Sequence, residues 1–205
     1  MSKKCILVGG GEFCREKFKV EKDVPVVAVD SGYEYVKDLV KPYLVVGDFD
    51  SLGYFPSGEK LVIRDPVKDF TDMYIAVEYM AERGYCEFEI YGGLGKRLDH
   101  TVANFQMARG FVEKGLKIKF IGSTEEVEFI TDDFYARGEA GETFSLFAFG
   151  DCKGVTIQNA KYNLENASLS DSFPLGVSNE FIGEWCYIAV KEGVLIYIRL
   201  DKGVE

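Results

Sequence analysis

The sequence is poor in the residues that build several common kinds of site. It contains one histidine, His100, so a histidine-rich metal centre is excluded. A Ser-His-Asp triad would have to use His100, and no G-x-S-x-G motif supports one, so we expect a supporting role for this residue. The five cysteines are scattered and contain no C-x-x-C pair, which indicates neither a zinc site nor a disulfide framework. We expect reduced thiols, mostly in the core of a cytosolic protein.

Positive charge and long apolar runs are also lacking. The formal net charge is -10 and the sequence pI is about 4.8, which argues against broad binding to nucleic acids or anionic membranes. The first apolar run covers only 5–8, too short for a signal peptide, and no run approaches membrane-spanning length. We therefore expect a cytoplasmic protein without nucleic-acid or membrane partners. The negative net charge does not argue against a small anionic ligand that is bound together with a divalent metal.

The 205 residues divide into two regions of different pattern. Up to Asp133, short apolar runs alternate with amphipathic stretches, which predicts an α/β domain (1–133) with a parallel sheet covered by helices. The expected strands are 5–8, 24–29, 43–46, 61–63, 88–91 and 118–121, and the expected helices are 71–83 and 100–114.

The region 134–205 has the pattern of an antiparallel β domain. Its expected strands are 143–149, 155–158, 185–190 and 194–200, and VKEGVL (190–195) has the composition of a hairpin turn. No low-complexity segment or internal repeat interrupts either region.

Two aspartates follow the third expected strand, in LVVGDFDSL (44–52). If the extended geometry persists, Asp48 and Asp50 point to the same side. Two such charges ~5 Å apart repel by roughly 3 kcal/mol at an effective dielectric of about 20. Either a cation relieves this repulsion, or the segment is a turn, for which Gly-Asp-x-Asp-Ser is favourable chemistry.

Glycines follow two other expected strands. Gly9–Gly11 either brings backbone amides close to a phosphate or forms a tight turn, and it lacks the G-x-G-x-x-G pattern because position 14 is Cys14. GGLGKR (92–97) lacks P-loop spacing but places Lys96 and Arg97 at a glycine-rich strand-to-helix junction, where anions bind well.

Acidic residues occupy the expected helix starts. In KDFTD (68–72), Asp69 or Thr71 would cap the helix, while Asp69 and Asp72 would share one helical face. Asp99 begins the next expected helix and is a second plausible cap.

Five aspartates thus fall at strand ends or helix starts of one parallel sheet, where ligands bind in folds of this kind. They are Asp48, Asp50, Asp69, Asp72 and Asp99. Carboxylate oxygens without nitrogen or sulfur ligands suit Mg²⁺, which bridges to substrate phosphates. The combination predicts a magnesium and phosphate site.

The ordered motifs VDSG, GDFDS, KDFTD, GGLGKRLDHTVAN, YNLENASL and GVSNEF resemble those of the thiamine pyrophosphokinase family over nearly the whole chain. The resemblance implies an N-terminal Rossmann-like α/β domain that binds ATP and Mg²⁺, and a C-terminal antiparallel β-sandwich domain that binds thiamine and dimerises. It also implies a homodimer with sites between subunits. The reaction would transfer the diphosphoryl group of ATP to the hydroxyethyl group of thiamine, giving thiamine diphosphate and AMP.

The resemblance also implies roles for individual residues. Catalytic roles fall to Asp48, Asp50, Asp69, Asp72, Arg97 and Asp99. The implied metal ligands are Asp48, Asp50 and Asp72. The implied ATP contacts are Asp30, Ser31, Gly93, Lys96, Arg97 and Asn104. The implied thiamine contacts are Asp72, Asp99, Tyr162, Ser178 and Asn179. Either Asp72 or Asp99 would orient the thiamine hydroxyl or accept its proton.

Three positions depart from the family pattern: Lys96 and Ser31 stand where glycine is common, and Tyr162 where tryptophan is frequent. Tyrosine keeps an aromatic face for stacking on the thiamine ring. Without the resemblance, Tyr162 would be interpreted as a core residue and Ser178–Asn179 as a turn. The alternative functions are diphosphoryl transfer to another alcohol, such as a pterin, and non-catalytic binding of thiamine or a nucleotide.

Overall fold

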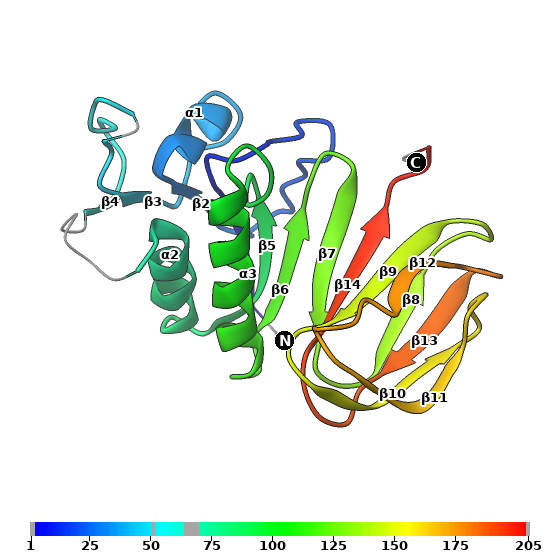
Figure 1. Cartoon of the computed structure of the whole chain (residues 1–205). Helices are drawn as coiled ribbons and strands as arrows, with labels where there is room; N and C mark the ends of the chain where they lie inside the picture. Colours follow the sequence, from blue (N-terminus) through cyan, green and yellow to red (C-terminus); the bar gives the residue numbers. More distant parts are fainter. Residues whose placement is uncertain (1–2, 51, 64–69, 204–205) are drawn as a thin grey trace. The chain divides into compact units, whose positions relative to one another are not determined.

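The computed structural model describes residues 3–50, 52–63 and 70–203 and contains two compact units (Figure 1). The first holds the described residues up to Ala108 together with Gly115–Ser123, and the second holds Arg109–Lys114 and the residues from Thr124 onward. The sequence pattern placed a boundary at 133. Strand β7 (Glu125–Ile130) lies before that point and pairs with β14 (Leu195–Leu200), a partner that a local pattern does not reveal.

The first unit contains a parallel sheet of six strands, as predicted. They are β1 (Lys3–Val8), β2 (Val26–Val29), β3 (Leu44–Gly47), β4 (Leu61–Ile63), β5 (Tyr85–Tyr91) and β6 (Lys117–Ile121). Their order is β6-β5-β1-β2-β3-β4, and every neighbouring pair is parallel. The central strands are fully buried, which explains why their sequences are continuous apolar runs with no polar alternation.

Helices connect these strands. They are the 3₁₀ turn η1 (Asp30–Gly32), α1 (Tyr33–Val36), α2 (Asp72–Ala81) and α3 (Leu98–Val112). The N-cap of α2 is Thr71, whose Oγ1 accepts a hydrogen bond from Tyr74 N at 3.2 Å. The predicted apolar face of α2 is buried, and the helix packs against β2, β3 and β5 (Figure 1).

The strand order creates a switch point beside β1. From β1 the chain adds β2, β3 and β4 on one side, and then returns to add β5 and β6 on the other. The loops that follow β1 and β5 therefore leave neighbouring strands in opposite directions. In open α/β sheets, such a crevice at the carboxyl ends of the strands is where ligands bind.

The second unit is an antiparallel β-sandwich. Its strands are β7, β8 (Phe134–Arg137), β9 (Thr143–Ala148), β10 (Cys152–Gln158), β11 (Leu164–Leu169), β12 (Gly176–Glu180), β13 (Trp185–Ala189) and β14. One layer has the order β12-β9-β14-β7 and the other β11-β10-β13-β8. Side chains from both layers, such as Phe144 and Ile188, form one core.

The hairpin predicted at 190–195 is wrong. β13 pairs with β10 and β8, whereas β14 pairs with β7 and β9, so the segment between them crosses from one layer of the sandwich to the other. A glycine-containing turn between two apolar runs looks the same in sequence whether the runs pair with each other or with different partners.

All five cysteines are free thiols, and Cys5, Cys152 and Cys186 are buried, as predicted. Burial raises the pKa of the Cys5 thiol to about 12 and that of Cys186 to about 11, so neither is a reactive thiolate near neutral pH. Within the described part of the chain, no helix is both long and apolar enough to cross a bilayer.

Candidate active site

A cavity of about 380 Å³ lies at the carboxyl ends of β1, β2 and β5 in the first unit. It is lined by Gly9, Gly10, Gly11, Val29, Asp30, Ser31, Thr71, Asp72, Met73, Gly92, Gly93, Gly95, Lys96, Arg97, His100 and Asn104. These residues come from the switch point of the sheet, and all six residues that the family resemblance implies to contact ATP lie among them. The size is that of an ordinary small-molecule site.

Two glycine loops form one wall of the cavity by direct backbone contact. Gly9 N donates to Tyr91 O at 2.8 Å, and Gly11 N donates to Gly92 O at 2.7 Å. A Cβ on Gly9 would lie 2.7 Å from Gly92 O, and one on Gly92, whose φ is +59°, would lie 2.2 Å from Gly9 O. Only glycine permits this approach, which leaves backbone rather than side chains facing the cavity.

Asp30 and Asp72 line the cavity, and Asp48 lies near enough to Asp72 to act on its charge. Burial, and then the negative charges of Asp30 and Asp48, raise the pKa of Asp72 to about 6. Asp30 follows β2, Asp48 follows β3, and Asp72 is the first residue of α2. The sequence predicted repulsion between Asp48 and Asp50, whereas the repulsion found in the structure acts on Asp72 and comes from Asp30 and Asp48.

The described residues of the GDFDS motif, Gly47–Asp50, turn out of the strand, so the extended geometry that would make Asp48 and Asp50 face the same way does not persist. β3 ends at Gly47, and Phe49 is left-handed with φ +64° and a buried ring. Asp50 N donates to the Asp48 carboxylate at 3.1 Å, while the Asp50 side chain is exposed. The turn chemistry explains this backbone, and the roles of both carboxylates toward a metal stay predictions.

Arg97 and Asp99 form a paired group at the start of α3. Arg97 Nε and Nη2 donate to the two Asp99 carboxylate oxygens at 3.1 and 2.5 Å, and His100 N donates to Asp99 at 3.0 Å. The hydrogen bonds and charge of Arg97 lower the pKa of the Asp99 carboxyl. Asp99 is thus held as a carboxylate that orients Arg97 at the cavity.

Two further residues implied to contact ATP, Lys96 in this loop and Asn104 in α3, donate to backbone carbonyls. Asn104 is buried, and its Nδ2 donates to Gly93 O at 2.7 Å. Lys96 Nζ donates to Gly10 O at 3.0 Å and to the Tyr35 hydroxyl. The cavity therefore has cationic and backbone groups on one side and carboxylates on the other.

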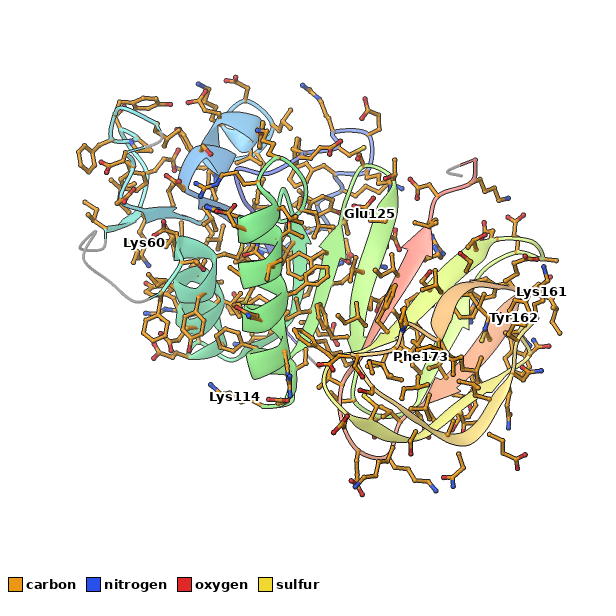
Figure 2. All side chains as sticks on the ribbon, in the orientation of Figure 1. Lys60, Lys114, Glu125, Lys161, Tyr162 and Phe173 are labelled. Atoms are coloured by element: carbon orange, nitrogen blue, oxygen red, sulfur yellow. The ribbon has the colours of Figure 1, made fainter. Side chains whose placement is uncertain are left out.

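In the second unit, Tyr162 is exposed rather than a core residue, with 59% of its surface accessible. Its backbone is fixed by Asn179, which is only 4% exposed. Asn179 Oδ1 accepts from Tyr162 N and from Glu180 N, both at 2.9 Å, and Asn179 Nδ2 donates to Tyr162 O at 2.7 Å. Asn179 thus orders the segment that carries the exposed aromatic ring. Lys161 lies beside Tyr162, with its Nζ 5.6 Å from the ring centroid (Figure 2).

Ser178 lies in a β-bulge within β12 and not in a connecting turn. The pairing with β9 shifts between Gly176 and Asn179, and Ser178 is left-handed with φ +57°. Its N donates to Ser145 Oγ at 3.1 Å. Bulges of this kind redirect side chains at functional edges of sheets.

The structure thus gathers most of the predicted residues of the first unit around one cavity. Asp69 lies outside the described residues. Sequence reasoning did not select His100, Thr71 or Met73 as lining residues, nor Tyr35 beside the glycine loop. The position of His100 directly after Asp99 at a helix start was the one signal that pointed to it.

Comparison with known families matches both parts of the chain. Residues 19–120 match the family described as "Thiamin pyrophosphokinase, catalytic domain". Residues 130–195 match "Thiamin pyrophosphokinase, vitamin B1 binding domain". The chain belongs to the thiamine pyrophosphokinase family.

Individual relatives agree with this family. Thiamine pyrophosphokinase from Bacillus subtilis (strain 168) is 27% identical over 183 residues, covering 84% of this chain and 86% of the relative. The crystal structure of thiamine pyrophosphokinase from Bacillus subtilis is 23% identical, with a TM-score of 0.87 over 98% of this chain and 100% of that one. Thiamin pyrophosphokinase from Geobacillus thermodenitrificans is 24% identical, with a TM-score of 0.85 over 98% of each chain. At these identities the structural matches support the two-domain fold.

The carboxylates of the first unit fit a divalent cation better than a softer metal. The charged groups that act on Asp72 are the carboxylates of Asp30 and Asp48, and this repulsion favours a bound positive charge. Within residues 3–50, 52–63 and 70–203, no three His, Cys, Asp or Glu side chains lie close enough together to hold a metal alone. Mg²⁺ suits such a site because it binds through one or two carboxylates and completes its shell with water and substrate phosphates.

Proposed function

We propose that this chain transfers the diphosphoryl group of ATP to the hydroxyethyl group of thiamine, giving thiamine diphosphate and AMP. The observation that carries the proposal is the cavity at the switch point, which is lined both by Lys96 and Arg97 on a glycine loop and by the carboxylates Asp30 and Asp72. Phosphates favour the first group, and a divalent cation favours the second. The two family matches support the same reaction, because one is described as the catalytic domain of a thiamin pyrophosphokinase and the other as its vitamin B1 binding domain.

In this reaction the thiamine hydroxyl oxygen forms a bond to the β-phosphorus of ATP. The bond from that phosphorus to the bridging oxygen of the α-phosphate breaks, AMP leaves, and the hydroxyl proton goes to a carboxylate. Between the two acceptors that the family resemblance implies, Asp72 is favoured. Asp72 lines the cavity, whereas both carboxylate oxygens of Asp99 accept hydrogen bonds from Arg97.

The remaining groups of the first unit would bind and orient phosphates. Arg97, oriented by Asp99, would face the charge that develops on the transferred group or on the leaving AMP. Gly93 and Asn104 would shape the loop against the phosphates, and Asp30 and Ser31 would contact the nucleotide from the end of β2. Asp48, Asp50 and Asp72 would hold Mg²⁺, and the resemblance assigns a catalytic role to Asp69, which lies outside the described residues. When bound, Mg²⁺ neutralises the negative charge that builds up on the phosphates during transfer.

The second unit would bind thiamine through Tyr162. Thiamine is a cation, so stacking on an exposed tyrosine ring would contribute ~0.5 to 2 kcal/mol. Asn179 would act through the backbone of Tyr162, and the bulged Ser178 would contact the pyrimidine. We propose that the protein is a cytoplasmic homodimer in which each site draws on both subunits.

The decisive test measures AMP release from ATP and Mg²⁺ with and without thiamine, together with mass identification of the product. AMP and thiamine diphosphate formed in equal amounts, only with thiamine, are the expected result. Release of AMP with a pterin alcohol but not with thiamine would show that the enzyme uses another alcohol as the acceptor. Binding of either ligand with no AMP formed would make the chain a binding protein.

The shared site has its own test. An Asp50→Asn chain and a Tyr162→Ala chain are mixed under conditions that exchange subunits, and activity is assayed at a thiamine concentration low enough for both variants to be nearly inactive alone. About a quarter of wild-type activity should return, because half of the dimers would be mixed and each would hold one intact site. Full activity of a wild-type monomer in dilute solution would refute the shared site without affecting the proposed reaction.

A further inference from the structure

Lys96 adopts a backbone conformation that glycine adopts most easily. Its φ is +51°, in the left-handed region, where a lysine side chain is strained. Strain of this kind persists where surrounding contacts compensate for it, and it gathers at functional sites. The contacts that Lys96 makes therefore indicate why a side chain is present there.

The ammonium group of Lys96 is engaged with the opposite loop and with α1. Lys96 Nζ donates to Gly10 O at 3.0 Å and to the Tyr35 hydroxyl, and it lies 5.1 Å from the centroid of the Tyr35 ring. The Tyr35 hydroxyl in turn donates to Gly11 O at 3.0 Å. Phe13 stacks on Tyr35 with 5.0 Å between centroids and 5° between planes, which fixes the ring.

These contacts join three segments that are distant in sequence, and two of them line the cavity. The loop after β5 carries Lys96, the loop after β1 carries the carbonyls of Gly10 and Gly11, and α1 carries Tyr35. Lys96 and Tyr35 together hold both of those carbonyls as hydrogen-bond acceptors. The orientation of the loop amides toward a phosphate depends on where these carbonyls point.

We propose that Lys96 and Tyr35 form a latch that positions the Gly9–Gly11 loop for the nucleotide triphosphate, and that Lys96 is a positioning residue and not a direct phosphate ligand. This inference rests on the proposed function and deepens its nucleotide site. The neighbouring Arg97, which is oriented by Asp99 and lines the cavity, supplies the direct cationic contact. The alternative is that Lys96 leaves Gly10 and Tyr35 and binds a phosphate itself.

A double-mutant cycle separates the two roles. The dissociation constants of ATP and of AMP are measured by calorimetry, without thiamine, for Lys96→Met, Tyr35→Phe and the double variant. A latch predicts that each single change weakens ATP binding about tenfold, the size expected for one hydrogen bond to a charged group, and that the double variant is no weaker than the weaker single variant. A direct phosphate ligand predicts that Tyr35→Phe has little effect and that the two effects multiply.

Further variants separate the latch from a structural role. Lys96→Gly removes the latch but relieves the left-handed strain, so its melting temperature should stay at or above that of wild type while ATP affinity falls. A fall in affinity that appears only together with a lower melting temperature would overturn the proposal. Lys41→Met, which removes an exposed lysine in the same unit, controls for loss of one positive charge and should leave the affinity within twofold.

The outcomes also distinguish the latch from the proposed function. If wild type does not bind ATP, the proposed function fails. If wild type binds ATP and the Lys96 and Tyr35 effects multiply, the latch alone is wrong. A turnover assay adds a further readout, because the latch predicts a raised KM for ATP with an unchanged KM for thiamine in both single variants.

Discussion

Asp72→Asn is expected to make the protein more stable and nearly inactive. Burial and the charges of Asp30 and Asp48 raise the pKa of Asp72 from 3.8 to about 6, so the ionised carboxylate is unfavourable in the folded state. At ~1.4 kcal/mol for each pH unit, this difference corresponds to roughly 3 kcal/mol. Solvent screening of the partly exposed carboxylate reduces the figure to about 1–2 kcal/mol. The neutral asparagine has a similar shape and removes this cost.

The gain depends on pH in a direction that follows from the shift. Between pH 3.8 and about 6, the folded protein binds a proton at Asp72 that the unfolded chain does not bind. The free energy of unfolding of the wild type therefore increases as the pH falls through 6, because Asp72 becomes protonated in the folded state. The cost of holding an ionised Asp72 is gone below about pH 4. The advantage of Asp72→Asn should be complete above pH 6 and should disappear toward pH 4.

Thermal unfolding of both proteins in EDTA at pH 8, 7, 6 and 5 checks this expectation. A stabilisation of about 1–2 kcal/mol corresponds to a melting temperature roughly 2–8 °C higher for a chain of this size at pH 8. Asp38→Asn, which changes an exposed carboxylate in the same unit, should show no such gain. A gain that is equal at pH 8 and pH 5, or a lower melting temperature at pH 8, would refute the reasoning.

Added Mg²⁺ extends the same experiment. A ligand that binds the folded state stabilises it, so Mg²⁺ with a non-hydrolysable ATP analogue should raise the melting temperature of wild type more than that of Asp72→Asn. Turnover of the variant should fall by about 10²-fold or more, as for loss of a group that stabilises transition-state charge. An equal rise in the melting temperatures of both proteins would contradict a role for Asp72 in binding Mg²⁺.

Three further predictions concern residues whose surroundings are now defined. Asp50→Asn should leave the melting temperature unchanged, because the backbone N–H that donates to the Asp48 carboxylate is kept. Turnover should fall ~10²-fold. Near-normal rates in saturating Mg²⁺ would show that Asp50 serves only the turn. Tyr162→Ala should raise the KM for thiamine several-fold with little change for ATP, and equal losses for both substrates would indicate a structural role. Asn179→Ala should cost about 2 kcal/mol in unfolding free energy, because three hydrogen bonds of a buried amide are lost, and denaturant unfolding would measure it; an unchanged midpoint would contradict the contacts.

The sequence predicted the elements whose signals are local. The six parallel strands were visible as apolar runs, and α2 was visible from its apolar spacing and from the capping position of Thr71. Strands such as β11 (LENASL) and β12 (GVSNE) were not predicted, because they mix polar and small residues and have few buried side chains. Their pairing depends on neighbours in the sandwich that a local pattern does not contain.

Several residues that line the cavity were predicted from the sequence, but their contacts were not. Motif order and strand ends selected Asp72 and Arg97, because parallel strands bring their carboxyl ends to one edge. The partners of these groups were not visible, since Phe49 turns the chain out of the strand and separates the environments of Asp48 and Asp50. The contact between Lys96 and Tyr35 joins residues 61 positions apart, so it could not be predicted from a local sequence pattern.

The order of the strands explains why the two kinds of charge lie on different sides of the cavity. Lys96 and Arg97 follow β5, the glycines of Gly9–Gly11 follow β1, and Asp30 and Asp48 follow β2 and β3. In the sheet these strands are neighbours in the sequence β5-β1-β2-β3, so cations, bare backbone and carboxylates succeed one another along its edge. A chain of phosphates placed across the glycines would have basic groups at one end and a divalent cation at the other. Exchanging the positions of any two of these strands would break that succession, so the charge separation is a property of the topology as much as of the motifs.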